Sequence, residues 1–497
     1  MDSAQHAKPY IDHGQQTNNI VCFIERPRVD NPFVMQAAQC LFDGAPADAL
    51  RIARMGMTLA GDDPALLEIA AESTLQLGDD AGAADCLQRL VALDPSDAAA
   101  CSNLGIALER LGHPDTAEAA YRQSLAHQPD AAGTHSNLGV LLTDLHREAE
   151  AEACFRQALA LQPDFARARM NLGQLLLAQG RFTEGWPLHE GRLTEHADPA
   201  SGPDPIAAAG LRHWQGEALA GKSIIVLPEQ GLGDEIQFCR YLPWLKARGA
   251  AQVTLVCRPS QTALLQTLAG PDTVISQADA LPRLAAHDYW TVLLSLPLHA
   301  GTTLETIPAD VPYLHPDPAR VARLAPLLAG NGLKVGLVWR GNPLHSNDAE
   351  RSLPGLEVLA PLWAIPGVRF FSLQKDAGPL PPDLPLTDLA PVIADFADSA
   401  ALLSRLDLLI SIDSAPAHLA GALGVPCWLL LPARKTDWRW LRGRDDSPWY
   451  PGMRLFRQTQ RGDWLEPVGK LVETLMASKP TRSADEQDQM GRSTEPC

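Results

Sequence analysis

The N-terminal half of this chain repeats itself every 34 residues. The tripeptide Asn-Leu-Gly occurs at residues 103–105, 137–139 and 171–173, and a proline occurs at residues 95, 129 and 163. The segments Ala117–Leu125 and Ala151–Leu159 both read Ala-Glu-Ala-x-aromatic-Arg-Gln-x-Leu. A period of this length indicates stacked helical pairs, because a single pair cannot bury its own apolar face and needs its neighbours to form a core.

The period is that of the tetratricopeptide repeat, which predicts an all-α solenoid over residues 33–191. Tyr121, Phe155 and Leu87 are expected to occupy one structural slot, as the large apolar residue of each second helix. Residues 34–67 look like a degenerate repeat that caps the solenoid. The last repeat departs from the pattern, and Trp186 is expected to dock onto the region that follows.

The residue pattern changes from Lys222 onward, where short aliphatic runs alternate with segments of helical periodicity. We expect strands at Ile224–Leu227, Gln252–Cys257, Tyr289–Leu296, Lys334–Trp339, Val368–Leu373, Asp407–Ile412 and Pro426–Leu431. Alternating strands and helices favour parallel sheets covered on both faces. The proline-rich segment 312–331 falls midway and is expected to separate two such sheets.

Composition excludes several functional classes. The chain has 497 residues, of which 46% are hydrophobic and 20% charged, which is typical of a soluble globular protein. A net charge of −18 without a basic stripe argues against a nucleic-acid partner. Because no apolar run reaches the length of a membrane span and no secretion signal is visible, we expect a cytoplasmic protein. The nine cysteines include no Cys-x-x-Cys pair and are expected to be reduced packing residues.

Two turns carry the strongest chemical signal. A buried strand ends at Asp413-Ser414 and a small-residue helix containing Pro416 and His418 starts at once. A strand at residues 223–227 is likewise followed by Gly231-Leu-Gly-Asp234. A helix that begins just beyond a parallel strand presents free N–H groups and a partial positive charge, which together favour an anion. Each turn alone is equally compatible with an ordinary α/β connection.

In their order and spacing, these two segments resemble the signature segments of glycosyltransferase family 9, the heptosyltransferase family. The resemblance covers about residues 211–476. It implies a metal-independent hexosyl- or heptosyltransferase with a GT-B fold of two Rossmann-like lobes. The layout is similar to bacterial proteins that join tetratricopeptide repeats to such a domain, and more distantly to protein O-GlcNAc transferases. The expected organisation is a tail (1–32), repeats (33–191), a linker (192–217), an N-terminal acceptor lobe (218–316), a C-terminal donor lobe (317–476) and a disordered tail (477–497).

The resemblance also implies roles for individual residues. Asp234 matches the catalytic Asp of the family and is the candidate general base, although an Asp at this position also serves as a helix cap. Gly231 and Gly233 shape the phosphate-facing turn. In the loop after residue 339, Arg340, Asn342, His345 and Arg351 are expected to contact the donor diphosphate. The alternative is a solvated loop with surface arginines.

The remaining candidates lie at other strand ends of the donor lobe. Lys375 ends a strand beside the expected cleft, although an exposed lysine needs no functional explanation. Asp413, Ser414 and His418 are expected to bind phosphate or a sugar hydroxyl, whereas the alternative is two capping residues and a satisfied core histidine. The chain contains no Asp-x-Asp, so we expect neither a metal nor a cofactor beyond the nucleotide-sugar substrate. The aromatic segments 435–440 and 447–450 suit either a sugar platform or packing between the lobes.

The N-terminal lobe looks short for this family, which suggests that the repeats supply part of the acceptor site. The acceptor would then be a protein, a peptide or a large glycan. Two other classes stay open. One is a repeat scaffold with an inactive nucleotide-sugar-binding domain, and the other is a sugar-nucleotide epimerase of the same two-lobed fold.

Overall fold

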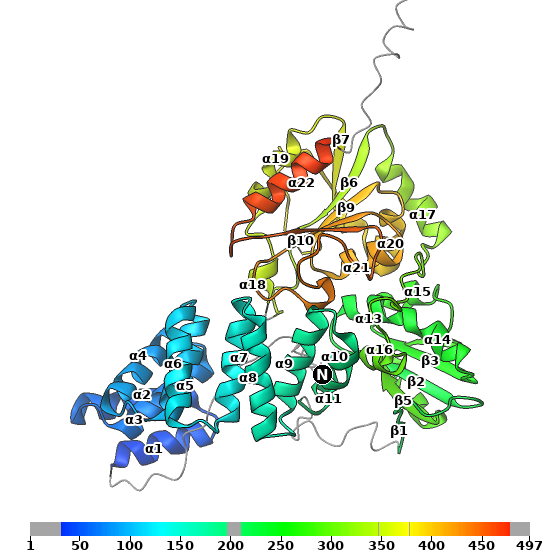
Figure 1. The fold of residues 1–497 in the computed structure, drawn as a ribbon. Coiled ribbons are helices and arrows are strands. Elements are labelled where there is room, and N and C mark those ends of the chain that lie inside the picture. Colours follow the sequence, from blue (N-terminus) through cyan, green and yellow to red (C-terminus); the bar gives the residue numbers. More distant parts are fainter. Residues whose placement is uncertain (1–30, 196–209, 346, 377, 478–497) are drawn as a thin grey trace, which may run out of the picture. The chain divides into compact units, whose positions relative to one another are not determined.

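The computed structural model describes residues 31–195, 210–345, 347–376 and 378–477. The chain divides into two compact units, one ending at residue 202 and one beginning at residue 203. The first is helical and the second contains two parallel sheets (Figure 1). The predicted tails 1–32 and 477–497 and the middle of the predicted linker 192–217 lie almost wholly outside the described residues.

The helical unit consists of successive antiparallel pairs, with short turns between the two helices of each pair (Figure 1). Its helices are α1 (Pro32–Phe42), α2 (Pro46–Ala60), α3 (Pro64–Leu77), α4 (Asp80–Leu93), α5 (Ala98–Arg110), α6 (Pro114–His127), α7 (Ala132–Asp144), α8 (Glu148–Leu161), α9 (Ala166–Ala178), α10 (Phe182–His189) and α11 (Arg192–Glu195). The predicted solenoid is therefore confirmed. Its core is continuous from α1 to α9, as expected when each pair relies on its neighbours for burial.

Two successive repeats each pack a glycine of the first helix against a large ring of the second. Gly139 in α7 lies on Phe155 in α8, and a Cβ atom at Gly139 would come within 2.7 Å of that ring. Gly105 lies on Tyr121 in the same way. Both rings, and Leu87 at the equivalent position, are fully buried. The small residue allows the two helices to approach closely enough for the ring to fill the space between them.

The turn between the paired helices also repeats. Its left-handed residue recurs every 34 positions, as Gly78, Gly112, His146 and Gly180 with φ of 75°, 81°, 58° and 78°. Glycine adopts this conformation without a Cβ clash, and it commonly ends helices for that reason. His146 is the exception in the series.

The first sheet of the second unit has the order β1-β5-β2-β3-β4, and all its strands are parallel. They are β1 (Arg212–His213), β2 (Ser223–Leu227), β3 (Gln252–Cys257), β4 (Thr273–Ser276) and β5 (Tyr289–Val292). The accompanying helices are α13 (Leu232–Phe238), α14 (Leu242–Ala247), α15 (Thr262–Leu265) and α16 (Leu296–His299).

The second sheet has the order β11-β10-β9-β6-β7-β8 and is also parallel throughout. Its strands are β6 (Leu333–Val338), β7 (Val368–Ser372), β8 (Leu386–Asp388), β9 (Leu408–Ile412), β10 (Cys427–Leu431) and β11 (Met453–Arg457). Its helices are α17 (Pro318–Leu324), α18 (Asp348–Arg351), α19 (Ala360–Trp363), α20 (Phe396–Leu403), α21 (Ala415–Ala422) and α22 (Leu465–Ala477). The predicted α/β region is confirmed by these two sheets, which we call the first lobe and the second lobe.

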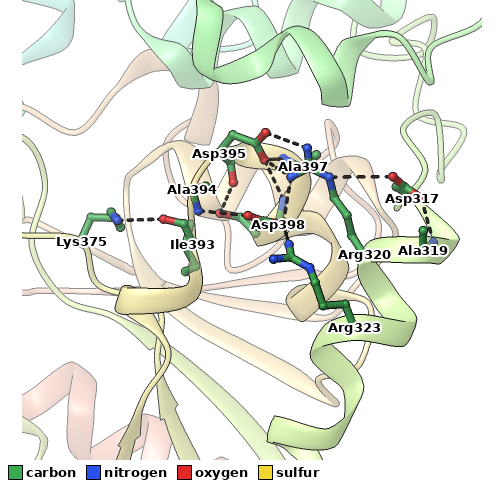
Figure 2. A network of polar contacts seen from close by, with 11 residues as sticks. Asp317, Ala319, Arg320, Arg323, Lys375, Ile393, Ala394, Asp395, Ala397 and Asp398 are labelled. Atoms are coloured by element: carbon green, nitrogen blue, oxygen red, sulfur yellow. Dashed lines mark hydrogen bonds and ion pairs between the residues drawn. The ribbon is translucent and has the colours of Figure 1, made fainter.

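An ion-pair network fixes α17, at the start of the second lobe, to the N-terminus of α20 (Figure 2). Arg320 donates to Asp395 at 2.6 and 3.0 Å and to Asp398 at 2.8 Å. Asp395 in turn accepts the N–H groups of Ala397 and Asp398, as a helix N-cap does. Asp398 is only 1% exposed and also pairs with Arg323, so its buried charge is fully compensated.

All seven predicted strands form, with one error of extent. The run Tyr289–Leu296 is strand only as far as Val292, and a 3-10 turn and α16 follow. Pro297 lies in the first turn of α16, where the missing N–H costs nothing, so the apolar run continues as helix. Among the described residues, no helix is long and apolar enough to span a bilayer.

Candidate functional site

The strand order brings two loops of the second lobe together. The chain runs outward from β6 to β7 and β8, then returns to the opposite side of β6 as β9. Val338 pairs with Ser411, so the loop after β6 and the turn after β9 leave the sheet side by side. In open parallel sheets, a reversal of strand order at the carboxyl ends is where ligands bind. Ten of the eleven predicted site residues, all except Lys375, lie in these two segments, in the first lobe's turn after β2, or in the short helices that follow them.

The turn after β9 leads directly into α21. Ser414 precedes that helix, and its hydroxyl donates to Ile412 O at 3.2 Å and lies 3.0 Å from Ser411 Oγ. Asp413 lies beside it, with Oδ1 3.9 Å from His418 Nε2. Burial and the negative charge of Asp437 raise the pKa of Asp413, whereas the positive charges of Arg351 and Arg439 counter part of this rise. Asp413 therefore lies within the field of two arginines.

His418 is a buried neutral histidine. Its Nδ1 lies 3.0 Å from the Tyr450 hydroxyl, and its ring stacks on Trp440 with centroids 5.2 Å apart. Burial, with the positive charges of Arg439 and Arg240, holds the pKa of His418 well below its usual value. The ring can donate or accept a hydrogen bond at Nε2, but it carries no charge at neutral pH.

In the loop after β6, three of the four predicted residues bond to the loop itself. Arg340 is exposed, and its Nη2 donates to Pro354 O at 3.1 Å. Asn342 accepts the N–H of Leu344 at 3.0 Å, and His345 Nδ1 accepts that of Asn347 at 3.1 Å. These bonds shape the loop.

Arg351 differs from the other three. Its side chain is 15% exposed and lies 3.5 Å from Asp348. Its buried Nε makes no hydrogen bond to any residue that the structure describes. The positive charge of Arg351 also lowers the pKa of Asp413, so Arg351 acts on the turn after β9.

Lys375 stands apart from this group. Its ammonium donates to Ile393 O at 2.9 Å (Figure 2) and to Ala390 O at 3.3 Å. These bonds tie the end of β7 to the segment before α20. Gln374, which sequence reasoning missed, joins the sheet ends more directly, since its Oε1 accepts the N–H groups of Trp339 at 3.0 Å and Arg340 at 2.8 Å.

The first lobe contributes the turn between β2 and α13. Gly231 N–H donates to Asp234 Oδ2 at 2.7 Å, which closes the turn as a helix cap. Gly233 lies directly on the His418 ring, where a Cβ atom would come within 2.7 Å of Cδ2. The first turn of α13 therefore contacts α21 of the second lobe, and only glycine allows this approach. The two signature turns meet.

Arg439 joins the second lobe to the turn after β2 and was missed from the sequence. It is 4% exposed, forms an ion pair with Asp234 of the first lobe and donates to Asp437 at 2.7 Å. Its guanidinium lies over the Trp438 ring, 4.6 Å from the centroid, and over Phe238 at 5.3 Å. The signal was present as a charged residue between two tryptophans, but its partner lies 205 residues away in the sequence.

A second buried arginine, Arg240, also crosses between the lobes. It donates to Trp449 O at 2.8 Å and to the Tyr313 hydroxyl at 2.9 Å. Its guanidinium lies 4.6 Å from the ring centroids of both Tyr313 and Tyr450. Of the two interpretations of the aromatic segments, packing between the lobes is the one that describes Trp438, Trp449 and Tyr450 here.

Glu235, next to Asp234, is fully buried and pairs with Arg258. Burial raises the pKa of Glu235 to about 7, although Arg258 opposes the shift.

In the part of the chain that the structure describes, no three His, Cys, Asp or Glu side chains are grouped to hold a metal ion.

Comparison with known proteins supports the assignment of the helical unit as tetratricopeptide repeats. The tetratricopeptide-repeat family matches residues 98–131 and 137–185. A curated relative, Protein FlbA of Caulobacter vibrioides, is 32% identical over 325 residues, which cover 60% of this chain and 53% of the relative. The chain thus spans about half the length of the curated relative that it matches.

Two solved structures resemble part of the chain. Residues 41 to the end of MamA from Desulfovibrio magneticus are 18% identical with a TM-score of 0.30, covering 36% of this chain and all of that one. TTC0263, a tetratricopeptide-repeat protein of Thermus thermophilus, is 23% identical with a TM-score of 0.30, covering 35% of this chain and 94% of that one. From its own repeats, helical pairs and family match, the N-terminal unit is a tetratricopeptide-repeat solenoid.

Proposed function

We propose that the α/β unit is a glycosyltransferase of the two-lobed GT-B type. It would move a hexosyl or heptosyl group from a nucleoside-diphosphate sugar to an acceptor that the repeats help to select. One observation carries the proposal. The turn after β2 and the turn after β9, one from each lobe, meet at Gly233 and His418 at the carboxyl ends of parallel sheets.

The proposed chemistry assigns one task to each turn. Asp234 would accept the proton of the acceptor hydroxyl as that oxygen attacks the anomeric carbon of the sugar. The bond from this carbon to the diphosphate breaks, and its electron pair goes to the diphosphate. The N-terminal N–H groups of α21, the Ser414 hydroxyl and Arg351 would stabilise that charge. We propose a metal-independent reaction because the sequence lacks Asp-x-Asp.

The repeats would determine which acceptor the enzyme uses. Tetratricopeptide solenoids present extended surfaces made from successive helical pairs, which suit a protein or peptide better than a small molecule. We therefore propose that the acceptor is a protein, a peptide or a glycan carried on one.

A thermal-shift screen tests the donor. UDP-, GDP-, ADP- and dTDP-sugars at millimolar concentration are each added to the full chain, and one class should raise the melting temperature. A ligand present at about 100 times its Kd stabilises the folded state by about 2.7 kcal/mol. Arg351→Gln should abolish the shift. Arg405→Gln removes an exposed charge just before β9, at the opposite end of that strand, and should preserve the shift. If none of the four classes stabilises the protein, the proposal is wrong.

A second candidate is a repeat scaffold whose α/β unit binds a nucleotide sugar without transfer. It is favoured by the engagement of both Asp234 carboxylate oxygens, one by Gly231 N–H and one by Arg439. A base whose lone pairs are occupied is a weak one. If Asp234→Asn keeps donor binding and every cellular role, the scaffold is correct. If it keeps binding and loses release of nucleoside diphosphate, the transferase is correct.

A further inference from the structure

The guanidinium of Arg439 is a buried charge at the contact between the two lobes. It is buried between two aromatic rings, yet it reaches the carboxylate of the other lobe that we propose as the base. An arginine stays protonated even when buried, so its charge must be compensated by neighbours. Asp234 and Asp437 supply this compensation here.

Arg439 is also the chain neighbour of Trp440, whose ring stacks on His418 in the helix that follows the turn that would receive the diphosphate. Its charge acts on both Asp413 and His418, which belong to the turn after β9 and the first turns of α21. A guanidinium has five N–H donors. Nη1 donates to Asp437 and Nη2 to Asp234, whereas the buried Nε finds no acceptor among the described residues. The side chain thus has unused hydrogen-bonding capacity within a polar cluster.

We propose that Arg439 binds the leaving diphosphate and exchanges Asp234 for it during the reaction. This inference rests on the proposed function. As the acceptor oxygen bonds to the anomeric carbon, its proton passes to the Asp234 carboxylate, which becomes neutral and loses its attraction for Arg439. In the same step the bond from the anomeric carbon to the diphosphate breaks, and the electron pair leaves one more negative charge on the diphosphate. Arg439 then pairs with the diphosphate, so that proton uptake in one lobe strengthens binding of the leaving group in the other.

The exchange predicts a different result from a model in which Arg439 only holds the two lobes together. If Asp234 competes with the diphosphate for Arg439, then neutralising Asp234 should strengthen diphosphate binding. If Arg439 only holds the lobes together, the same change should weaken binding or leave it unaltered. Removing a negative charge strengthens the binding of any nearby anion, so the gain must also be shown to require Arg439.

Calorimetric titration at fixed ionic strength tests the exchange on the full chain. The probes are inorganic pyrophosphate and UDP, GDP, ADP and dTDP, and the variants are Asp234→Asn, Arg439→Gln, Arg439→Lys, the double variant Asp234→Asn with Arg439→Gln, and the control Arg405→Gln. We expect Asp234→Asn to bind the preferred nucleoside diphosphate about three- to tenfold more tightly, which corresponds to about 0.7–1.4 kcal/mol. Arg439→Gln should bind it at least about tenfold more weakly, Arg439→Lys should fall between, and the control should match the wild type.

The double variant decides the mechanism, because a coupled pair is not additive. In the Arg439→Gln background, Asp234→Asn should give no gain. A gain of the same size there, or unchanged affinity in a correctly folded Asp234→Asn protein, overturns the exchange and leaves the proposed function intact. Failure of the wild type to bind any probe at millimolar concentration overturns both. If the Arg439→Gln proteins do not fold, the test uses Arg439→Lys with and without Asp234→Asn.

Discussion

Gly139 should tolerate no side chain, although it sits in the middle of a helix where alanine is normally the better residue. In α7 its backbone lies on the Phe155 ring, and an added Cβ atom would be 2.7 Å from Cε1 and 2.8 Å from Cδ1. Ordinary carbon contacts are about 3.5–4.0 Å, so the ring or the helix must move by about 1 Å. The ring is fully buried.

The free energy of Gly139→Ala is the difference between two terms. Alanine gains about 0.5–1 kcal/mol over glycine in a helix interior, because it restricts the unfolded chain. Overpacking a well-packed core costs about 1–3 kcal/mol. Taking the middle of each range, we therefore expect a net loss of about 1 kcal/mol in the opening free energy of α7 and α8.

Gly469 in α22 is the matched control. It is also inside a helix, but apart from the adjoining backbone of α22 no atom of the described residues lies within 4 Å of its would-be Cβ. Gly469→Ala should therefore stabilise α22 by about 0.5–1 kcal/mol. Hydrogen exchange read by mass spectrometry gives the opening free energy of each helix separately, so both variants can be measured locally in the full chain.

Phe155→Leu should partly restore α7 and α8 when it is combined with Gly139→Ala, because the smaller side chain leaves room for the Cβ atom. A Gly139→Ala protein whose α7 and α8 exchange as slowly as the wild type, or more slowly, would refute the packing argument. Equal losses at Gly139 and Gly469 would refute it too, since only one of them contacts a ring.

Three further predictions concern other parts of the chain. His146→Gly should stabilise the turn between α7 and α8 by about 0.5–1 kcal/mol, measured by hydrogen exchange, because glycine adopts φ near 58° without strain; a loss would mean that contacts of the imidazole outweigh the strain. Burial, with the charges of Asp97 and Asp63, raises the pKa of Glu68 to about 7. The folded state then binds more protons than the unfolded state between about pH 4.5 and 7, so this group lowers the free energy of unfolding as pH rises. Glu68→Gln should stabilise the helical unit by about 1–2 kcal/mol at pH 8 and by much less at pH 5, measured by urea unfolding, and an equal effect at both values contradicts the shift. Finally, a chain that starts at Gly210 should keep donor binding and lose transfer to the natural acceptor; full transfer would show that the repeats do not select it.

Much of the fold follows from local patterns. The 34-residue period locates the helical pairs because each pair repeats the same packing problem, as Gly105 and Gly139 show with their rings. The long aliphatic runs locate the central strands because both faces of a parallel sheet are buried. Strands β1, β4, β8 and β11 were not predicted. β1 and β8 have only two and three residues, with half-exposed or exposed side chains, so they lack the apolar run that marks a buried strand.

The candidate site was predictable only in part. The turns at Gly231–Asp234 and Asp413–Ser414 are visible because each follows a strand and starts a helix, and those features are local. That the two turns meet depends on strand order and on the packing of α13 against α21, which no local pattern records. Lys375 was selected for its place at a strand end, but the carbonyls that it binds lie 15 and 18 residues further along the chain.

The two arginines that join the lobes differ in the nature of their partners, and this difference decides what each can do. The partners of Arg240 are backbone carbonyls, the Tyr313 hydroxyl and aromatic faces, none of which changes charge at neutral pH. Releasing it would leave a buried charge without compensation, so Arg240 suits a permanent joint. Arg439 is paired with carboxylates, which can be protonated or displaced by a stronger anion. If the proposed transfer takes place, Arg439 is therefore the one of these two arginines whose contact can respond to it, while the contacts of Arg240 keep the lobes in register.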